Sequence, residues 1–152
     1  DLILITNRPD EYAHLGLPMF GDLYPETGPL GGIYTAVYHA THPHVLTVAC
    51  YMPWLNRPLL EYIVSLRETA DVVVPRWDKF PEPLHAVYSK ACLEPIKEKL
   101  DAQMYKITVF YGRVSLRFVS REEIEQFDPE GRSFVNVNTP EELAEREDTT
   151  QG

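Results

Sequence analysis

Short apolar runs alternate with helically periodic segments along the first half of the chain. The apolar runs predict strands at Leu2–Thr6, Leu17–Phe20 and Asp71–Pro75. Apolar residues at helical spacing predict helices over Asp10–Leu15, Ile33–Ala40 and Arg57–Arg67. Strands that alternate with helices form right-handed βαβ units. The pattern therefore predicts an α/β fold, with a mainly parallel sheet that carries helices on both faces.

The longest apolar run extends from Val45 to Leu55 without a charged residue. Such a run is typical of a strand buried on both faces, in the centre of a parallel sheet. It ends at Met52-Pro53, where proline cannot continue a ladder of hydrogen bonds. Tyr51 then falls at the carboxyl end of the predicted central strand, which is where ligands bind in open α/β sheets.

The second half of the chain is less regular. Strands are predicted at Leu84–Tyr88, which need not be parallel to the others, at Ser115–Val119 and at Ser133–Asn138. Helices are predicted at Ala91–Leu100, at Arg121–Phe127 after an N-cap at Ser120, and from Thr139-Pro140 onward. The segment Tyr105–Tyr111 fits either a helix or a strand. We expect a single domain over residues 1–146 and a frayed tail over residues 147–152.

Composition limits the classes of function. The 152 residues carry a formal net charge of −9, which argues against a general nucleic-acid binder, because phosphate backbones attract clustered cations. It leaves room for one phosphorylated ligand bound by a few local donors. No apolar run reaches the roughly 20 residues of a membrane span. Both cysteines, Cys50 and Cys92, stand inside apolar elements, and two buried thiols suggest a reducing, cytoplasmic location.

Polar residues follow four of the predicted strands: Asn7-Arg8, Asp22, Tyr51 and Arg76. In a parallel sheet the loops after the strands lie on one rim, so these residues would face a common crevice. Each alone is also compatible with a turn or a surface role. Their convergence is the stronger argument for a site.

Three further features are candidates, each with a purely structural alternative. The segment Gly28-Pro29-Leu30-Gly31-Gly32 could present the N–H groups of a helix start to an anion, or form a tight loop-to-helix junction. Asn136 and Asn138 could reach into the crevice, or only organise a turn. His85, beside a predicted strand, is a candidate for a ligand pocket.

Several motifs in this order resemble the molybdenum cofactor guanylyltransferases, the MobA-like nucleotidyltransferases. They are Thr6-Asn7-Arg8-Pro9, Asp22 before Gly28–Gly32, Ala49–Pro53, Val74-Pro75-Arg76 with Glu82–Tyr88, and Phe134–Leu143. The resemblance covers nearly the whole chain. It implies a Rossmann-like sheet of the nucleotide-diphospho-sugar transferase type, and transfer of GMP from GTP to the molybdenum cofactor with release of pyrophosphate and help from Mg²⁺.

By this resemblance, the nucleotide would be bound by Asn7, Arg8, Asp22, Gly28, Pro29, Leu30 and Gly31. The acceptor would be bound by Arg76, His85, Asn136 and Asn138. Tyr51 stands where the family has its metal-binding aspartate, and a neutral phenol with a pKa of about 10 is a poor ligand for Mg²⁺. Asp22 is then the carboxylate left to hold the metal, and Tyr51 and Asp22 are the candidate catalytic residues.

The family's glycine-rich phosphate loop, a Leu-Ala-Gly-Gly followed by Arg-Met-Gly and a lysine, has no counterpart in the sequence. The chain starts where the family's second strand would lie, so the sequence given could be a fragment, and it stays open whether the parent protein carries this strand–loop–helix unit. Without the unit, a strand edge near Leu2–Thr6 would be open, and we expect self-association there. Two alternatives stay open: a catalytically silent homologue that binds nucleotide, pterin or a partner protein, and a transferase for another base or acceptor.

Overall fold

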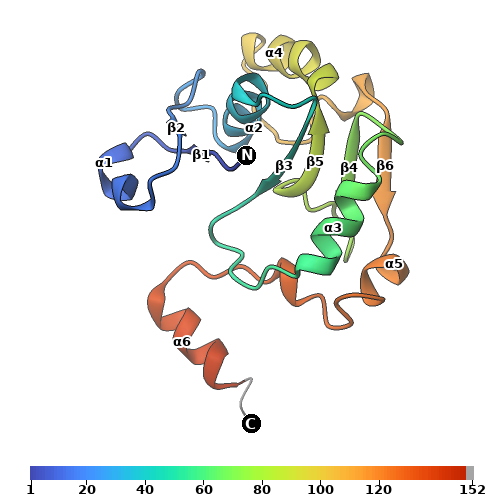
Figure 1. Cartoon of the computed structure of the whole chain (residues 1–152). Coiled ribbons are helices and arrows are strands. Elements are labelled where there is room, and N and C mark those ends of the chain that lie inside the picture. Colours follow the sequence, from blue (N-terminus) through green and yellow to red (C-terminus); the bar gives the residue numbers. More distant parts are fainter. Residues whose placement is uncertain (150–152) are drawn as a thin grey trace.

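Six strands form two sheets in the computed structural model, which describes residues 1–149 (Figure 1). β1 (Leu4–Ile5) and β2 (Met19–Phe20) pair in parallel as a two-stranded sheet. The four-stranded sheet has the order β3-β5-β4-β6, made of β3 (His44–Val48), β5 (His85–Ser89), β4 (Val72–Pro75) and β6 (Leu116–Val119). β5 is antiparallel to both of its neighbours, whereas β4 and β6 are parallel. β3, β4 and β6 therefore share one direction.

Helices cover both faces of the four-stranded sheet, as the sequence predicts. α2 (Pro29–His39) and α4 (Leu93–Asp101) pack on the face that receives Val72 and Val74. α3 (Arg57–Ser65) and α5 (Arg121–Glu125) pack on the opposite face, which receives Val73. Successive residues of a strand point to opposite faces, so the apolar run of β4 is buried by both helix layers.

α2 connects the two sheets, because it contacts β1 as well as β3. Leu30 and Val37 on this helix are 0% exposed. At its carboxyl end, the Lys90 ammonium donates hydrogen bonds to the backbone carbonyls of Val37, Tyr38 and Ala40. A cation at a helix carboxyl end satisfies unpaired carbonyls and interacts favourably with the helix dipole. Lys90 thus ties α2 to the end of β5.

The N-terminal helix ends where the sequence predicts. α1 (Pro9–Tyr12) continues as a 3₁₀ turn at Ala13–Leu15. The turn ends at Gly16, whose φ of 64° lies in the left-handed region. Glycine adopts this conformation without the steric cost that a Cβ adds.

The predicted central strand is an edge strand. β3 ends at Val48, pairs only with β5 in the described part of the chain, and its first four residues are half-buried rather than buried. The apolar run has a different cause. Val45 packs toward the α2 side and Leu46 toward the α3 side, while Met52 is 3% exposed in the loop that follows. Two covered faces and a buried loop residue together produce the pattern of a central strand.

The chain from Ser133 to Asn138 is not a strand, which corrects a second prediction. It consists of a 3₁₀ turn at Arg132–Phe134 and an extended loop. Buried Asp128 orders the turn, because its carboxylate accepts hydrogen bonds from the backbone N–H and hydroxyl of Ser133. The segment Tyr105–Tyr111, for which the sequence fits either a helix or a strand, forms neither an α-helix nor a strand. Turns at residues 107–110 lead into a short 3₁₀ helix at Tyr111–Arg113.

Two helix starts confirm the capping signals. Ser120 and Glu123 form a reciprocal capping box at α5. The Thr139 side chain accepts the N–H of Glu142 at the start of α6 (Pro140–Asp148). Residues 147 and 148, predicted as part of a frayed tail, belong to α6, and residues 150–152 of that tail lie outside the described residues. Within residues 1–149, no helix combines the length and apolar character needed to cross a membrane.

His85 is buried in the core on the α3 side of the sheet. It is 0% exposed, and neither ring nitrogen has a hydrogen-bond partner. Its ring lies edge-on to Phe134 at a centroid distance of 5.1 Å. Burial lowers the pKa of His85 to about 4, although the nearby Asp128 carboxylate acts in the opposite direction. The imidazole is therefore neutral in the folded protein near neutral pH.

We expect His85 to make the fold sensitive to acid. Its pKa is about 4 in the folded state and roughly 6.5 in the unfolded state, so between these values only the unfolded chain takes up the proton. The free energy of unfolding should fall by about 3 kcal/mol from this group as the pH drops from above 7 to 4. Urea unfolding at a series of pH values measures the loss.

The matched variant is His85→Leu, which keeps an apolar side chain at the position and cannot be protonated. Other groups titrate equally in both proteins, so the difference between the two curves isolates His85. The variant should retain more stability at pH 4 than the unaltered chain. Parallel curves for the two proteins would contradict a buried neutral histidine.

Both sheets leave a strand edge open. β3 bonds to β5 through alternate residues, as the 3.1 Å bond from the Ala49 N–H to the Leu84 carbonyl shows, so the backbone groups of Leu46 and Val48 point away from β5. β1 pairs only with β2 among the described strands. Unpaired strand edges are templates for pairing with another chain.

The chain should self-associate through the β3 edge, with a particle mass that rises with concentration in light scattering. Val48 is 42% exposed, and Val48→Lys should reduce the association, because charged residues protect strand edges. Leu55→Lys is the control, since Leu55 is 47% exposed but lies in a loop. A monodisperse monomer at all concentrations, or equal effects of the two variants, would show that this edge does not pair.

Candidate functional site

Asn7 and Asp22 are joined by two hydrogen bonds just beyond the ends of β1 and β2. The Asn7 Nδ2 group donates to Asp22 Oδ2 at 3.0 Å. The Asp22 backbone N–H donates to Asn7 Oδ1 at 2.9 Å. The parallel pairing of the two strands, with the Thr6 N–H bonded to the Phe20 carbonyl at 2.9 Å, sets this alignment. Asp22 is half-buried, so its carboxylate has a fixed position and one oxygen, Oδ1, without a partner among these bonds.

The start of α2 lies beside this pair. A Cβ added to Gly32 would stand 3.9 Å from Asp22 Oδ1. Gly28, the residue before the helix, has a φ of 67°, which favours glycine. A Cβ on Gly31 would lie 2.0 Å from the Thr27 hydroxyl oxygen. Backbone geometry therefore requires glycine at Gly28, and close packing requires it at Gly31. The short distance at Gly32 places the first turn of α2 next to Asp22.

Tyr51 and Asn136 line one hollow with the start of α2. This Glu82 pocket has a volume of about 190 Å³. Its lining residues are Pro29, Tyr51, Met52, Glu82, Pro83, Leu84, Ile107 and Asn136. They come from the start of α2, the loop after β3, the segment before β5, the 105–111 turns and the loop before α6. Elements far apart in the sequence thus meet at this point.

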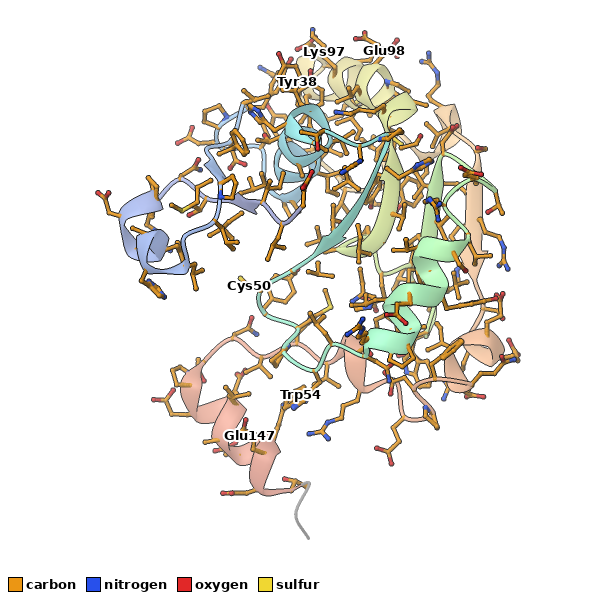
Figure 2. All side chains as sticks on the ribbon, viewed as in Figure 1. Tyr38, Cys50, Trp54, Lys97, Glu98 and Glu147 are labelled. Atoms are coloured by element: carbon orange, nitrogen blue, oxygen red, sulfur yellow. The ribbon has the colours of Figure 1, made fainter. Side chains whose placement is uncertain are left out.

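A second hollow, the Asn138 hollow, adjoins it with a volume of about 270 Å³. It is lined by Cys50, Pro53, Val137, Asn138, Thr139, Pro140 and Leu143. Cys50 lies on the loop after β3, across from the segment that enters α6 (Figure 2). A 2.7 Å hydrogen bond from the Val137 N–H to the Tyr51 carbonyl joins the two loops that line both hollows.

Two larger hollows lie elsewhere. One, of about 450 Å³, is lined by Asp71, Ser115 and their neighbours at the amino ends of β4 and β6. The other, of about 590 Å³, lies between Trp54, Arg132 and α6. Ligands of open α/β sheets bind at the carboxyl ends of the strands, which argues against the hollow at the amino ends of β4 and β6. The start of α2 forms part of the wall of the smaller Glu82 pocket and favours that pocket as the site.

The electrostatics of the Glu82 pocket are set by burial. Burial raises the pKa of the Tyr51 phenol, and the nearby Cys50 and Glu82 raise it further. Burial also raises the pKa of Glu82 to about 7, with a contribution from the Asp78 carboxylate. Tyr51 is thus a neutral phenol near neutral pH. No lysine or arginine lines either this pocket or the Asn138 hollow within residues 1–149.

A family model of the MobA-like NTP transferase domain matches residues 1–114. The chain belongs to this family. A probable molybdenum cofactor guanylyltransferase of Pelotomaculum thermopropionicum is 40% identical over 142 residues, which cover 93% of this chain and 69% of that protein. A probable molybdenum cofactor guanylyltransferase of Clostridium perfringens (strain 13) is 32% identical over 146 residues, which cover 93% of this chain and 73% of that protein.

Solved structures agree with the family assignment. The crystal structure of molybdopterin-guanine dinucleotide biosynthesis protein A from Archaeoglobus fulgidus superposes with a TM-score of 0.82 at 25% identity, covering 98% of this chain and 78% of that one. The predicted Rossmann-like α/β fold and the nucleotidyltransferase class of enzyme are thereby confirmed. Antiparallel β5 is the one reversed strand of the four-stranded sheet.

The structure of this MobA-like chain brings together part of the predicted site. Asn7, Asp22, the start of α2, Tyr51 and Asn136 form one continuous region, and Asn138 lines the adjoining hollow. Leu30 contributes its side chain to the core, and Gly31 is buried against Thr27. Only the backbone of these two residues is left to face a ligand.

Three predicted residues lie apart from both hollows. Arg8 pairs with Glu11 on α1 at 3.1 Å. The Arg76 guanidinium stacks on the Phe118 ring at 3.9 Å from its centroid. His85 is enclosed in the core, because strand alternation turns its side chain to the α3 face together with Val87. None of the three lines the Glu82 pocket or the Asn138 hollow.

Glu82, Met52 and Ile107 complete the pocket, and sequence reasoning did not select them as site residues. Glu82 stands between Pro81 and Pro83, directly after the loop that follows β4. An acidic residue held between two prolines near the end of a buried strand was the available signal. Met52 and Ile107 carried none, because apolar residues in loops are common on protein surfaces.

Removing the Asn7 side chain should loosen Asp22. Asn7→Ala loses both hydrogen bonds to Asp22, and the free energy of unfolding should fall by about 1 kcal/mol. Asn138→Ala is the control, because the Asn138 side chain makes no hydrogen bond within residues 1–149, and its stability should change by less than about 0.5 kcal/mol. Urea unfolding measures both, and equal stabilities would show that the pair does not fix Asp22.

Proposed function

We propose that this MobA-like chain acts in the transfer of GMP from GTP to the molybdenum cofactor, with release of pyrophosphate. The relatives named as molybdenum cofactor guanylyltransferases, at 32% to 40% identity, support the reaction. The observation in the structure that carries it is the hydrogen bond between Val137 and Tyr51. It holds the Asn136–Asn138 loop against the loop after β3, and Pro29 at the start of α2 lines the same pocket as Tyr51 and Asn136, so a nucleotide side and an acceptor side share one boundary.

The two sides have different chemistry. On the nucleotide side, the Asn7–Asp22 pair and the first turn of α2 offer a carboxylate oxygen and helix N–H groups, which suit a nucleoside and a phosphate. On the acceptor side, the amides of Asn136 and Asn138 can donate and accept hydrogen bonds. Nucleotidyl transfer depends on holding the attacking oxygen in line with the α-phosphate, and this is the task we assign to the boundary between the two sides.

The reaction forms a bond between a phosphate oxygen of the acceptor and the α-phosphorus of GTP. The bond from that phosphorus to the bridging oxygen breaks, and pyrophosphate leaves with its electron pair. Tyr51, at the boundary, is a neutral phenol whose hydroxyl can donate a hydrogen bond to a phosphate oxygen. This role differs from that of the aspartate which the family has at this position.

A divalent cation such as Mg²⁺ would neutralise charge on the triphosphate, because no lysine or arginine among the described residues lines either hollow. Within residues 1–149, no group of three or more His, Cys, Asp or Glu side chains could hold a metal ion. Mg²⁺ is commonly bound by one or two carboxylates together with substrate phosphates and water. Asp22, whose Oδ1 faces the start of α2, is the carboxylate that we propose for it.

The protein incubated with GTP, Mg²⁺ and molybdenum cofactor should release pyrophosphate. Asp22→Asn should lower the rate roughly tenfold or more, because a charged metal ligand is lost. It should also weaken the effect of Mg²⁺ on GTP binding, measured by calorimetry. Glu130→Asn is the control, since Glu130 is an exposed carboxylate that lines the hollow of about 590 Å³ between Trp54 and α6.

Tyr51→Asp separates this proposal from a catalytically silent homologue that only binds ligands. Pyrophosphate release by the unaltered protein would support the transferase. Release that occurs only in the Tyr51→Asp variant would show that Tyr51 has silenced the reaction. Release that depends equally on ATP, CTP or UTP would replace the guanylyl assignment by another base.

A further inference from the structure

The Glu82 carboxyl lies in the Glu82 pocket without a partner. Its backbone is fixed, since its N–H donates to the Pro75 carbonyl at 2.8 Å and its carbonyl accepts from the His85 N–H at 3.1 Å. Its side chain makes no hydrogen bond or ion pair with any residue in 1–149, and it is only half-exposed. A partly desolvated carboxyl without donors costs free energy, and a ligand that brings donors would recover it.

The walls of the pocket limit the shape of that ligand. They are mainly apolar, formed by Pro29, Met52, Pro83, Leu84 and Ile107. The volume of about 190 Å³ is below the roughly 300–1,000 Å³ of pockets that enclose a whole drug-sized ligand. The pocket can therefore take one ring system of a larger molecule. Apolar walls suit the faces of a flat ring, and the polar groups at Glu82, Tyr51 and Asn136 suit its edge.

We propose that Glu82 is a specificity-determining residue that accepts hydrogen bonds from the 2-amino-4-oxopyrimidine edge of a bound ring. This edge is common to pterins and to guanine, and it presents an amino group beside a ring N–H. The two carboxylate oxygens of Glu82 match two adjacent donors, and the Asn136 amide can donate to the neighbouring oxo group. The inference deepens the proposed function, on which it rests for the identity of the two candidate rings.

The protonation of Glu82 agrees with this role. Burial and the Asp78 carboxylate raise its pKa to about 7, so the carboxyl is only partly ionised near neutral pH. Donors from a ligand favour the charged form and lower the pKa again.

The test compares pterin with lumazine, which has the same ring system with an oxo group in place of the 2-amino group. Calorimetric titration of the unaltered chain should give roughly tenfold tighter binding of pterin, because a bidentate hydrogen-bonded pair discriminates by that order. Glu82→Gln replaces one acceptor oxygen by a donor, and the preference for pterin should disappear. Glu68→Gln is the matched control, because Glu68 is exposed and precedes β4, at the opposite end of the strand from Glu82.

Thermal unfolding checks that the variants fold. Without ligand, Glu82→Gln should melt at the same temperature as the unaltered chain or higher, because a half-buried unpaired carboxyl is removed. An unchanged preference in the folded Glu82→Gln variant would overturn the inference. So would equal binding of pterin and lumazine by the unaltered chain together with equal binding of GTP and ITP.

A parallel titration with GTP and with ITP, whose base lacks the 2-amino group, shows whether the ring that binds in the pocket is a pterin or a guanine. A preference for pterin that depends on Glu82 assigns the pocket to the acceptor. A preference for GTP that depends on Glu82 assigns it to the nucleotide. Both results support the inference. If neither preference depends on Glu82, the inference is refuted. These measurements need no turnover. Failure of pyrophosphate release would therefore contradict the proposed function without contradicting the recognition of the ring edge by Glu82.

Discussion

Helix α2 is packed between the two sheets, and its position sets the distance between the two sides of the candidate site. Leu30, Ile33 and Val37 bury it against the four-stranded sheet and α4, and the helix also contacts β1. Lys90 caps its carboxyl end. Its opposite end begins at Pro29, on the wall of the Glu82 pocket. Asp22 on one side and Tyr51 on the other therefore take their places from a single buried helix.

Two ionisable residues at and just before the start of β5 lie in opposite surroundings. His85 is enclosed and has no partner, so it stays neutral and costs stability in acid. Glu82, three residues earlier, faces a pocket, where a ligand can donate the hydrogen bonds that the Glu82 carboxyl does not receive from the protein. Unpaired polar groups in native structures are common at functional sites. Of these two residues, Glu82 is the one that combines such a group with access for a ligand.

The sequence predicted the parts of the fold that depend on local chemistry. The capping residues Ser120 and Thr139 and the stop at Gly16 each act within one turn of helix, so a local pattern suffices. The position of the Val45–Leu55 run in the sheet depended on which strand lies beside it. Burial of Val45 and Leu46 by helices on opposite faces gives an edge strand the same apolar pattern as a central one. A single sequence does not separate the two.

The sequence predicted the parts of the candidate site in which a strand end positions a residue. It missed the parts in which contacts between segments distant in the sequence position a residue. Asn7 and Asp22 follow adjacent parallel strands, so their pairing follows from the rule for sheet rims. His85 and Arg76 also stand near strand ends, but the alternation of side chains and stacking on Phe118 direct them elsewhere. The contact of Asn136 with the Tyr51 region rests on a loop whose backbone bond to Tyr51 no local pattern encodes.

Hydrogen–deuterium exchange with GTP, Mg²⁺ and a pterin tests most directly whether these separate segments form one binding region. Exchange slows where a ligand protects or orders the backbone. The account predicts slower exchange in three segments together, at residues 21–33, 49–53 and 135–138, with little change at residues 67–71 beside the larger hollow at the amino ends of the strands. Protection confined to residues 67–71 and their neighbours, or the absence of protection at 135–138, would contradict a shared site.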